Sequence, residues 1–332
     1  MLLTLQNFLS HSVDESIKWQ SFSAQLNADV YVESPLEGVL IFRPTGNLPQ
    51  QKHIVLSSGI HGNETAPMEI CNQLIADIAS GKLKISHALM FIFGNLPAIK
   101  QQTRFIEENL NRLFAPNIEG DSLEVPRAKA LMQQVSAFFK DATGERYHYD
   151  LHTAIRASKN EKFAVYPHLH GKAHSKTELQ FMSDCGVNTI LLSQSATTTF
   201  SYYSSRYHDA HAFTVELGKV KAFGQNNMND FVQADKMLRH LIADRELTLS
   251  AYEDCPLEIY KVNQVINKHH ADFKLHFSED TANFTDYCAG TLLASESGAK
   301  YYAQQDGEAI VFPNENVAIG QRALLTVVPC EL

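Results

Sequence analysis

His61 and Glu64 stand three residues apart in the segment 59–64, Gly-Ile-His-Gly-Asn-Glu. The apolar run at 53–60 is typical of a buried strand, and the residues after Glu64 have a helical pattern. An imidazole nitrogen and a carboxylate oxygen would therefore meet just past the end of a strand. Zn²⁺ takes both kinds of ligand at about 2.0–2.2 Å, so the pair predicts part of a zinc site.

A third ligand is available in the segment Asp150-Leu151-His152-Thr153, at the end of a short strand predicted over 147–151. His152 would complete a set of two histidines and one carboxylate, and catalytic zinc sites keep a fourth position for water or substrate. Asp150 lies two residues before His152, so on a strand both side chains face the same side. Its carboxylate could orient the imidazole, or it could simply be a solvated strand end.

Glu216 is the candidate general base. It lies in the apolar segment Thr214-Val215-Glu216-Leu217-Gly218. Apolar neighbours exclude water and raise the pKa of a carboxyl group toward the range that suits a base. The alternative from sequence alone is a glutamate at a strand end that faces water.

Two polar segments could bind an anionic substrate. Arg104, Asn111 and Arg112 lie together in the segment 103–114, and Tyr202 and Arg206 precede Glu216. Arginine binds carboxylates in a bidentate manner and stabilises developing oxyanions. A solvated loop remains the alternative for these residues.

The elements that must position these residues alternate between apolar strands and helices. Strands are predicted over 28–32, 38–42, 53–60, 87–94, 147–151, 188–192 and 212–217, and helices over 65–79, 126–140 and 231–244. This alternation predicts an α/β fold with a mixed, mainly parallel sheet flanked by helices. The three metal ligands lie at or just after carboxyl ends of strands, where open α/β sheets bind ligands.

The pattern changes from Pro256 onward, where strands and turns follow one another without a helical period. We therefore predict a catalytic domain over 1–254 and a smaller β-rich domain over 255–332.

Composition excludes several classes of protein. A formal charge of -9 and the absence of a basic run argue against nucleic acid and anionic membranes as partners. There is no signal-peptide pattern and no apolar run near the roughly 20 residues of a membrane span. Five scattered cysteines without a CxxC motif indicate a reduced, cytoplasmic protein. The sequence leaves a homo-oligomer open.

The motifs His61-Gly62-Asn63-Glu64, Asn111-Arg112, Asp150-Leu151-His152 and Glu216 resemble those of the succinylglutamate desuccinylase/aspartoacylase family, within the zinc carboxypeptidase-like superfamily. The resemblance covers nearly the whole chain in order, including the C-terminal β domain. The segments 59–67, 150–156, 216–219, 223–226 and 311–314 are most similar to the desuccinylase branch. Aspartoacylases supply a substrate-binding tyrosine from the C-terminal domain, and 314–320 contains none. This difference argues against N-acetylaspartate as the substrate.

The resemblance implies one Zn²⁺ per subunit, with water as its fourth ligand, and hydrolysis of N-succinyl-L-glutamate to succinate and L-glutamate. This reaction is the last step of arginine catabolism by the succinyltransferase route. The implied roles are His61, Glu64 and His152 as metal ligands, Glu216 as the base, Arg104 at the scissile carbonyl, Asn111 and Arg112 on one substrate carboxylate, and Tyr202 and Arg206 on another.

The carboxylate of the succinyl half still needs a cationic partner. We predict Arg156 for this role because it follows the ligand His152 by four residues, with Lys159 as a weaker candidate and a surface arginine as the alternative. Three other functions stay open: an aspartoacylase-like N-acyl amino acid deacylase, a carboxypeptidase, and a non-catalytic zinc-binding protein.

Overall fold

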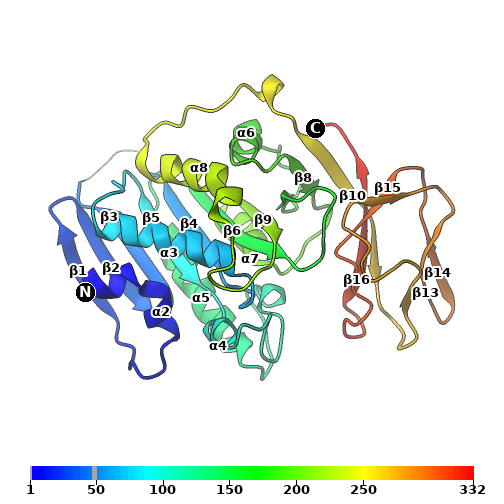
Figure 1. The fold of residues 1–332 in the computed structure, drawn as a ribbon, viewed down its shortest axis with the longest axis horizontal. Helices are drawn as coiled ribbons and strands as arrows, with labels where there is room; N and C mark the ends of the chain where they lie inside the picture. The colour runs from blue at the N-terminus through cyan, green and yellow to red at the C-terminus, as the bar shows by residue number, and fades with distance from the viewer. Residues whose placement is uncertain (1, 47–50) are drawn as a thin grey trace.

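The computed structural model describes residues 2–46 and 51–332 (Figure 1). Among these residues, one mixed sheet of 13 strands extends through the molecule. Its strands, in chain order, are β1 (Phe22–Asn27), β2 (Val30–Leu36), β3 (Val39–Pro44), β4 (His53–Ser58), β5 (Ala88–Phe93), β6 (Arg146–Ala154), β7 (Phe163–Tyr166), β8 (Thr189–Leu192), β9 (His211–Lys219), β10 (Glu258–Asn267), β12 (Thr285–Tyr287), β15 (Glu308–Val311) and β16 (Arg322–Pro329).

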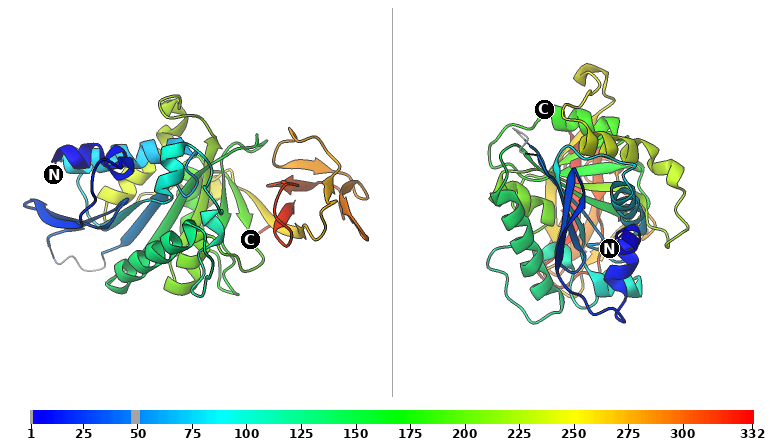
Figure 2. Two further views of the ribbon diagram at one scale, coloured as in Figure 1. Left: turned by 90° about the horizontal axis from the view of Figure 1, so that it is seen from below. Right: turned by 90° about the vertical axis from the view of Figure 1, so that its left-hand side faces the viewer.

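Helices cover both faces of the N-terminal part of this sheet, as Figure 2 shows. The α-helices are α1 (Leu2–Gln6), α2 (Phe8–Val13), α3 (Thr65–Ala79), α4 (Leu96–Gln101), α5 (Glu124–Lys140), α6 (Lys176–Asp184), α7 (Phe200–His208) and α8 (Val232–Ala243). One core contains Leu74 of α3 and Leu238 of α8, and the core on the opposite face contains Val135 of α5 and Tyr203 of α7. None of the helices in the described residues has the length and apolar character needed to cross a membrane.

The centre of the sheet consists of β5, β4, β6 and β9, which run parallel to one another. Every residue of β4 and β5 is buried, because helices cover both faces. Parallel strands direct all their carboxyl ends to one edge of the sheet. The turns after β4, β6 and β9 therefore come together at that edge.

The C-terminal segment continues the same sheet. β10 pairs in parallel with β8 and antiparallel with β16, which places β15 and β12 beyond it. A second sheet of three strands, β11 (Lys274–Leu275), β13 (Leu292–Glu296) and β14 (Ala299–Tyr302), packs over a separate core that includes Leu293 and Leu324. The boundary between 254 and 255 stays a prediction.

The α/β fold with a β-rich C-terminal part is confirmed, and the expected strands and helices appear with small changes in their ends. One change affects the site: β6 continues to Ala154, so His152 lies within the strand and not after it. The pattern did not predict α1, α2, α4, α6, α7 or β7, because short elements carry little periodic signal. The five cysteines form no disulfide bond, and Cys288 is the exposed one among them.

Gly62 lets the turn between His61 and Glu64 lie directly against α4. A Cβ atom on Gly62 would come within 2.0 Å of the backbone carbon of Ala98. The Gly62 amide also donates to the carbonyl oxygen of Arg104, at 3.2 Å. The absence of a side chain at Gly62 therefore fixes both the His61 turn and the start of the Arg104 loop.

Gly62→Ala is expected to destabilise the protein by roughly 1–3 kcal/mol, because the methyl group must displace the backbone of α4. Chemical denaturation followed by circular dichroism measures this change. Gly298→Ala shows the cost of backbone strain without a steric clash, since its Cβ meets nothing within 4 Å and its φ is 81°. That cost is about 1–2 kcal/mol. A Gly62→Ala protein as stable as the natural chain would contradict the packing argument.

Candidate metal centre and active site

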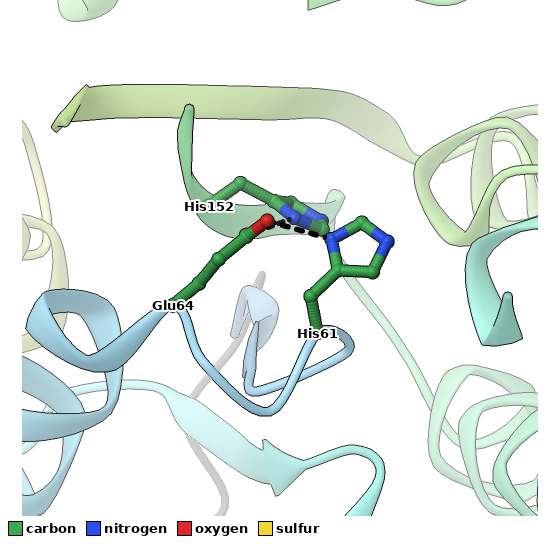
Figure 3. A group of neighbouring side chains, drawn as sticks. All are labelled: His61, Glu64 and His152. Carbon is green, nitrogen blue, oxygen red and sulfur yellow. Dashed lines mark hydrogen bonds and ion pairs between the residues drawn. The ribbon is translucent and has the colours of Figure 1, made fainter. Parts of the chain in front are cut away.

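His61, Glu64 and His152 converge at the carboxyl edge of the sheet, and their side chains point toward one another in Figure 3. His61 lies in the turn after β4, Glu64 is the residue before α3, and His152 projects from β6. All three are at most 4% exposed. One possible ligand atom from each lies within 4.8 Å of the others. The structure thus brings together the three ligands expected from the sequence.

Hydrogen bonds on the far side of each imidazole leave both Nδ1 atoms facing Glu64. Nε2 of His152 lies 2.9 Å from Asp150 Oδ2, and Nε2 of His61 lies 3.0 Å from Asn109 Oδ1. An N–H on each Nε2 satisfies these acceptors and leaves a lone pair on each Nδ1. Each Nδ1 lies 2.8 Å from an oxygen of Glu64.

The residues fit a zinc ion. His61 Nδ1 is buried and has no hydrogen-bond partner in the described part of the chain, although Glu64 Oε1 is only 2.8 Å away. These two atoms are both acceptors and repel each other when no hydrogen lies between them. A cation bound to both would remove this repulsion. Two imidazole nitrogens and a carboxylate suit zinc, and a four-coordinate ion with three protein ligands keeps one position for water or substrate.

The electrostatics agree with a cation site. Burial alone would raise the pKa of Glu64, but His61 and His152 outweigh it and hold this pKa well below its usual value. Burial lowers the pKa of His61 to about 4, so its imidazole is neutral at pH 7. For His152, Asp150 and Glu64 outweigh burial and hold the pKa well above its usual value. In the metal-free site, a protonated His152 thus supplies the positive charge that a bound cation would otherwise supply.

Glu216 lies beside the three ligands. It projects from β9, directly opposite His152 of β6 in the strand register, and is 7% exposed. Burial, followed by the negative charge of Glu64, raises the pKa of Glu216 to about 7. Its Oε2 is buried without a hydrogen-bond partner among the described residues. The carboxylate is thus free to exchange a proton.

Arg104 reaches the centre from the loop after α4. Its Nη1 donates to Glu64 Oε1 at 2.7 Å, and the side chain is 35% exposed. The buried carboxylate of Glu124 holds this loop through the amides of Ile106, Glu107 and Glu108, at 2.8 to 3.3 Å. Glu124 thereby positions the segment that supplies both Arg104 and Asn109.

Asn111 and Arg112 follow on the 3₁₀ helix η1 (Leu110–Arg112). The side-chain oxygen of Asn111 accepts from the Phe200 amide at 3.0 Å, so it supports the start of α7. Arg112 donates to the Asn111 carbonyl at 2.8 Å. Burial, followed by the charge of Arg104, lowers the pKa of Arg112 to about 10. Arg112 therefore faces the same region as Arg104, and the predicted substrate contacts of both residues of η1 stay a prediction.

Tyr202 and Arg206 make no hydrogen bond or ion pair with the metal ligands among the described residues. The Tyr202 hydroxyl lies 2.8 Å from His170 Nε2, and Arg206 lines a small hollow of about 110 Å³ with His170 and His211. His211 begins β9, and Glu216 lies five residues further along the same strand. At about 3.3 Å per residue, the Cα atoms of His211 and Glu216 are roughly 16 Å apart. The predicted contact of this pair with the same substrate gains no support from the geometry.

Arg156 is bound to the C-terminal domain. Its guanidinium donates to the carbonyl oxygens of Glu279, Thr281 and Pro313, at 3.0 Å for Thr281 and 3.3 Å for Pro313. Lys159 is paired with Asp286 at 2.8 Å. Neither cation makes a contact with the metal ligands among the described residues, so their predicted role at the succinyl carboxylate has no geometric support.

Sequence reasoning missed a buried polar chain beneath the ligands. Asp150 Oδ1 accepts from Ser57 at 2.5 Å, Ser57 lies 2.8 Å from His148 Nε2, and His148 Nδ1 lies 2.7 Å from Ser204. This chain fixes Asp150, which in turn orients His152. The sequence gives only a weak indication of this chain: His148, Asp150 and His152 are two residues apart, so they share one face of β6. Asn109 and Glu124 carry no signal beyond their polarity.

Comparisons with known proteins identify the family of this chain. Residues 50–242 match the family model of the succinylglutamate desuccinylase/aspartoacylase catalytic domain, and residues 255–330 match the AstE/AspA barrel-sandwich hybrid domain. The succinylglutamate desuccinylase of Pseudoalteromonas atlantica is 55% identical over 319 residues, which cover 94% of this chain and 90% of that protein.

Solved structures give the same result. The crystal structure of succinylglutamate desuccinylase from Vibrio parahaemolyticus has a TM-score of 0.89 at 37% identity, and covers 98% of this chain and 95% of that one. The enzyme from Vibrio cholerae has a TM-score of 0.90 at 35% identity, with 97% and 94% covered. The chain belongs to the succinylglutamate desuccinylase/aspartoacylase family.

Proposed function

We propose that the protein hydrolyses N-succinyl-L-glutamate to succinate and L-glutamate, with one zinc ion held by His61, Glu64 and His152. The convergence of these three side chains beside the buried, unpartnered carboxylate of Glu216 is the observation that carries this proposal. The names of the relatives supply the substrate. The cytoplasmic location, the step in arginine catabolism and the oligomeric state stay predictions.

The reaction needs a water molecule, a base and a group that stabilises negative charge on the amide oxygen. When bound, a zinc ion supplies Lewis-acid chemistry: it lowers the pKa of a coordinated water and polarises a carbonyl group. Glu216 accepts a proton from the attacking water at its unpartnered Oε2 as the new bond to the succinyl carbon forms. It then delivers that proton to the amide nitrogen as the carbon–nitrogen bond breaks.

Arg104 can stabilise the developing charge on the amide oxygen. Its guanidinium is partly exposed and donates through Nη1 to Glu64, so further N–H groups remain available. Such a donor contributes on the order of 3 kcal/mol in other hydrolases. Arg112, from the adjacent part of the loop, can hold a carboxylate of the glutamate half, together with Asn111.

Chelation is the first test. We expect the purified protein to release glutamate from N-succinyl-L-glutamate, to lose this activity in a chelator, and to regain it when Zn²⁺ is added back. N-acetyl-L-aspartate should release little aspartate. Amino acid analysis measures both products. Preferential release of aspartate would contradict N-succinyl-L-glutamate as the substrate. Hydrolysis that persists in a chelator would contradict a catalytic role for the metal.

Glu216→Gln separates catalysis from metal binding. We expect it to lower kcat by at least about 100-fold with unchanged zinc content, because the amide cannot accept the proton. Glu64→Gln is the matched comparison, and it should lose zinc as well as activity because the ligand charge is gone. Metal analysis and kinetics measure the two effects. A Glu216→Gln enzyme with full activity would favour a protein in which this carboxylate has no catalytic role.

The raised pKa of Glu216 also predicts how stability depends on pH in the metal-free protein. The folded chain keeps a proton on Glu216 up to about pH 7, whereas the unfolded chain releases it near 4.5. Ionisation is therefore unfavourable in the folded state, and stability falls as the pH rises through this window. Relative to Glu216→Gln, the natural protein should lose roughly 3 kcal/mol between pH 4 and pH 8.

Denaturation in the presence of a chelator at several pH values measures this difference. The two proteins should have similar free energies of unfolding below pH 4.5, and the Gln variant should be the more stable above pH 7. Parallel curves over the whole range would show that Glu216 does not titrate abnormally.

A further inference from the structure

Arg322 has no anionic partner in the part of the chain that the structure describes. It is the only arginine after Arg245 in the sequence, and it begins β16 in the C-terminal part of the chain. Its Nε is enclosed by protein and has no hydrogen-bond partner, and no ion pair among residues 2–46 and 51–332 includes this side chain. An enclosed cationic donor without an acceptor is costly, so a ligand that supplies the acceptor would explain it.

Three contacts connect Arg322 with the active site. Glu216 pairs with Phe163 across β9 and β7, and directly opposite residues in such a pair share one face of the sheet. The ring of Phe163 lies 5.5 Å from that of Phe312, and the Arg322 guanidinium lies 5.4 Å from the centre of the Phe312 ring. Two aromatic side chains therefore separate Arg322 from the base.

Phe312 supports Arg322 from a strained conformation. Its φ of 53° lies in the left-handed region, which a bulky residue rarely adopts. The side-chain oxygen of Asn283, which is 1% exposed, accepts from the Phe312 amide at 2.9 Å and holds it there. Strained residues that the surrounding structure fixes in this way often belong to functional sites.

The region around Arg322 is rich in positive charge. Burial, followed by the charges of Arg112 and Arg104, lowers the pKa of Arg322 to about 9. Of these three arginines, only Arg104 pairs with a carboxylate in the described residues. An anion would stabilise these guanidinium groups, which otherwise repel one another. A carboxylate fits this role, because it matches the planar guanidinium in a bidentate manner.

We propose that Arg322 binds a carboxylate of the substrate, so that the C-terminal domain contributes directly to specificity. This inference rests on the proposed function, because N-succinyl-L-glutamate carries three carboxylates and the loop at 104–112 accounts for only one. Arg156 cannot easily serve, since three backbone carbonyls already occupy its guanidinium. The Nε atom of Arg322, in contrast, has no acceptor in the part of the chain that the structure describes.

The experiment compares two variants on substrates that each lack one carboxylate. Arg322→Met keeps the length of the side chain without the charge, and Arg322→Lys keeps the charge without the bidentate fork. The substrates are N-succinyl-L-glutamate, N-butyryl-L-glutamate, N-succinyl-L-glutamine and N-succinyl-4-aminobutyrate. The first carries all three carboxylates. The second lacks the carboxylate of the succinyl group, the third that of the glutamate side chain, and the fourth that of the α-carbon.

On the full substrate, we expect Arg322→Met to lower kcat/KM by about 10- to 100-fold, mainly through KM, with an intermediate effect of Arg322→Lys. On the one analogue that lacks the carboxylate bound by Arg322, the variant and the natural enzyme should be nearly equal. That analogue identifies the carboxylate. An equal loss on all four substrates, or no loss on any, would overturn the proposal.

Two controls keep the result interpretable. Lys300→Met removes an exposed positive charge from the same domain and should leave kinetics unchanged. Thermal unfolding should show Arg322→Met to be about as stable as the natural protein, because the variant keeps the length of the side chain and loses no hydrogen bond or ion pair. A lower midpoint together with a uniform kinetic loss would indicate a structural role instead.

Failure of the proposed function would look different. A natural protein that does not hydrolyse N-succinyl-L-glutamate would overturn the activity, whatever the variants do. Calorimetric titration with succinate and with glutarate then tests Arg322 without turnover. Binding at least about tenfold weaker in Arg322→Met would support a carboxylate site, and equal binding of both dicarboxylates to both proteins would overturn it.

Discussion

The whole site depends on one buried negative charge. Glu64 is 2% exposed, and its two oxygens are approached by His61, His152 and Arg104 at 2.7 to 2.8 Å. A carboxylate so far from water is stable only while cations or donors surround it. The turn at Gly62, the end of β6 and the loop after α4 must therefore all be in place at once. The metal site is in this sense a folding constraint as well as a catalytic one.

Much of this site could be predicted from the sequence, because its ligands follow strong local signals. His61 and Glu64 flank a tight turn between a buried strand and a helix, and His152 shares a strand face with Asp150. The parallel centre of the sheet then brings the strand ends together. Glu216 was predictable for the same reason, and its raised pKa follows from apolar neighbours that are visible in the sequence.

Residues whose position depends on long-range packing were harder to predict. Arg156 lies near His152 in sequence, but the chain leaves β6 and its guanidinium binds the C-terminal domain. The resemblance assigns Tyr202 and Arg206 to a substrate carboxylate. In the structure Arg206 of α7 lines a hollow together with His211 at the start of β9, and the assigned role stays a prediction. Arg322 had no motif around it. The register of β7 with β9 and the contact of Phe163 with Phe312 connect it with the base through two aromatic side chains.

The pairing of β8 with β10 bears on how substrate reaches the metal. Four residue pairs, from Glu258 with Thr189 to Lys261 with Leu192, join the C-terminal strands to the catalytic sheet as one ladder. A swing of the C-terminal domain about this junction would break backbone hydrogen bonds, unlike a hinge through a loose linker. The β domain is then a fixed wall and not a lid. Substrate would then meet this domain in one fixed position, without a slow closing step in the turnover.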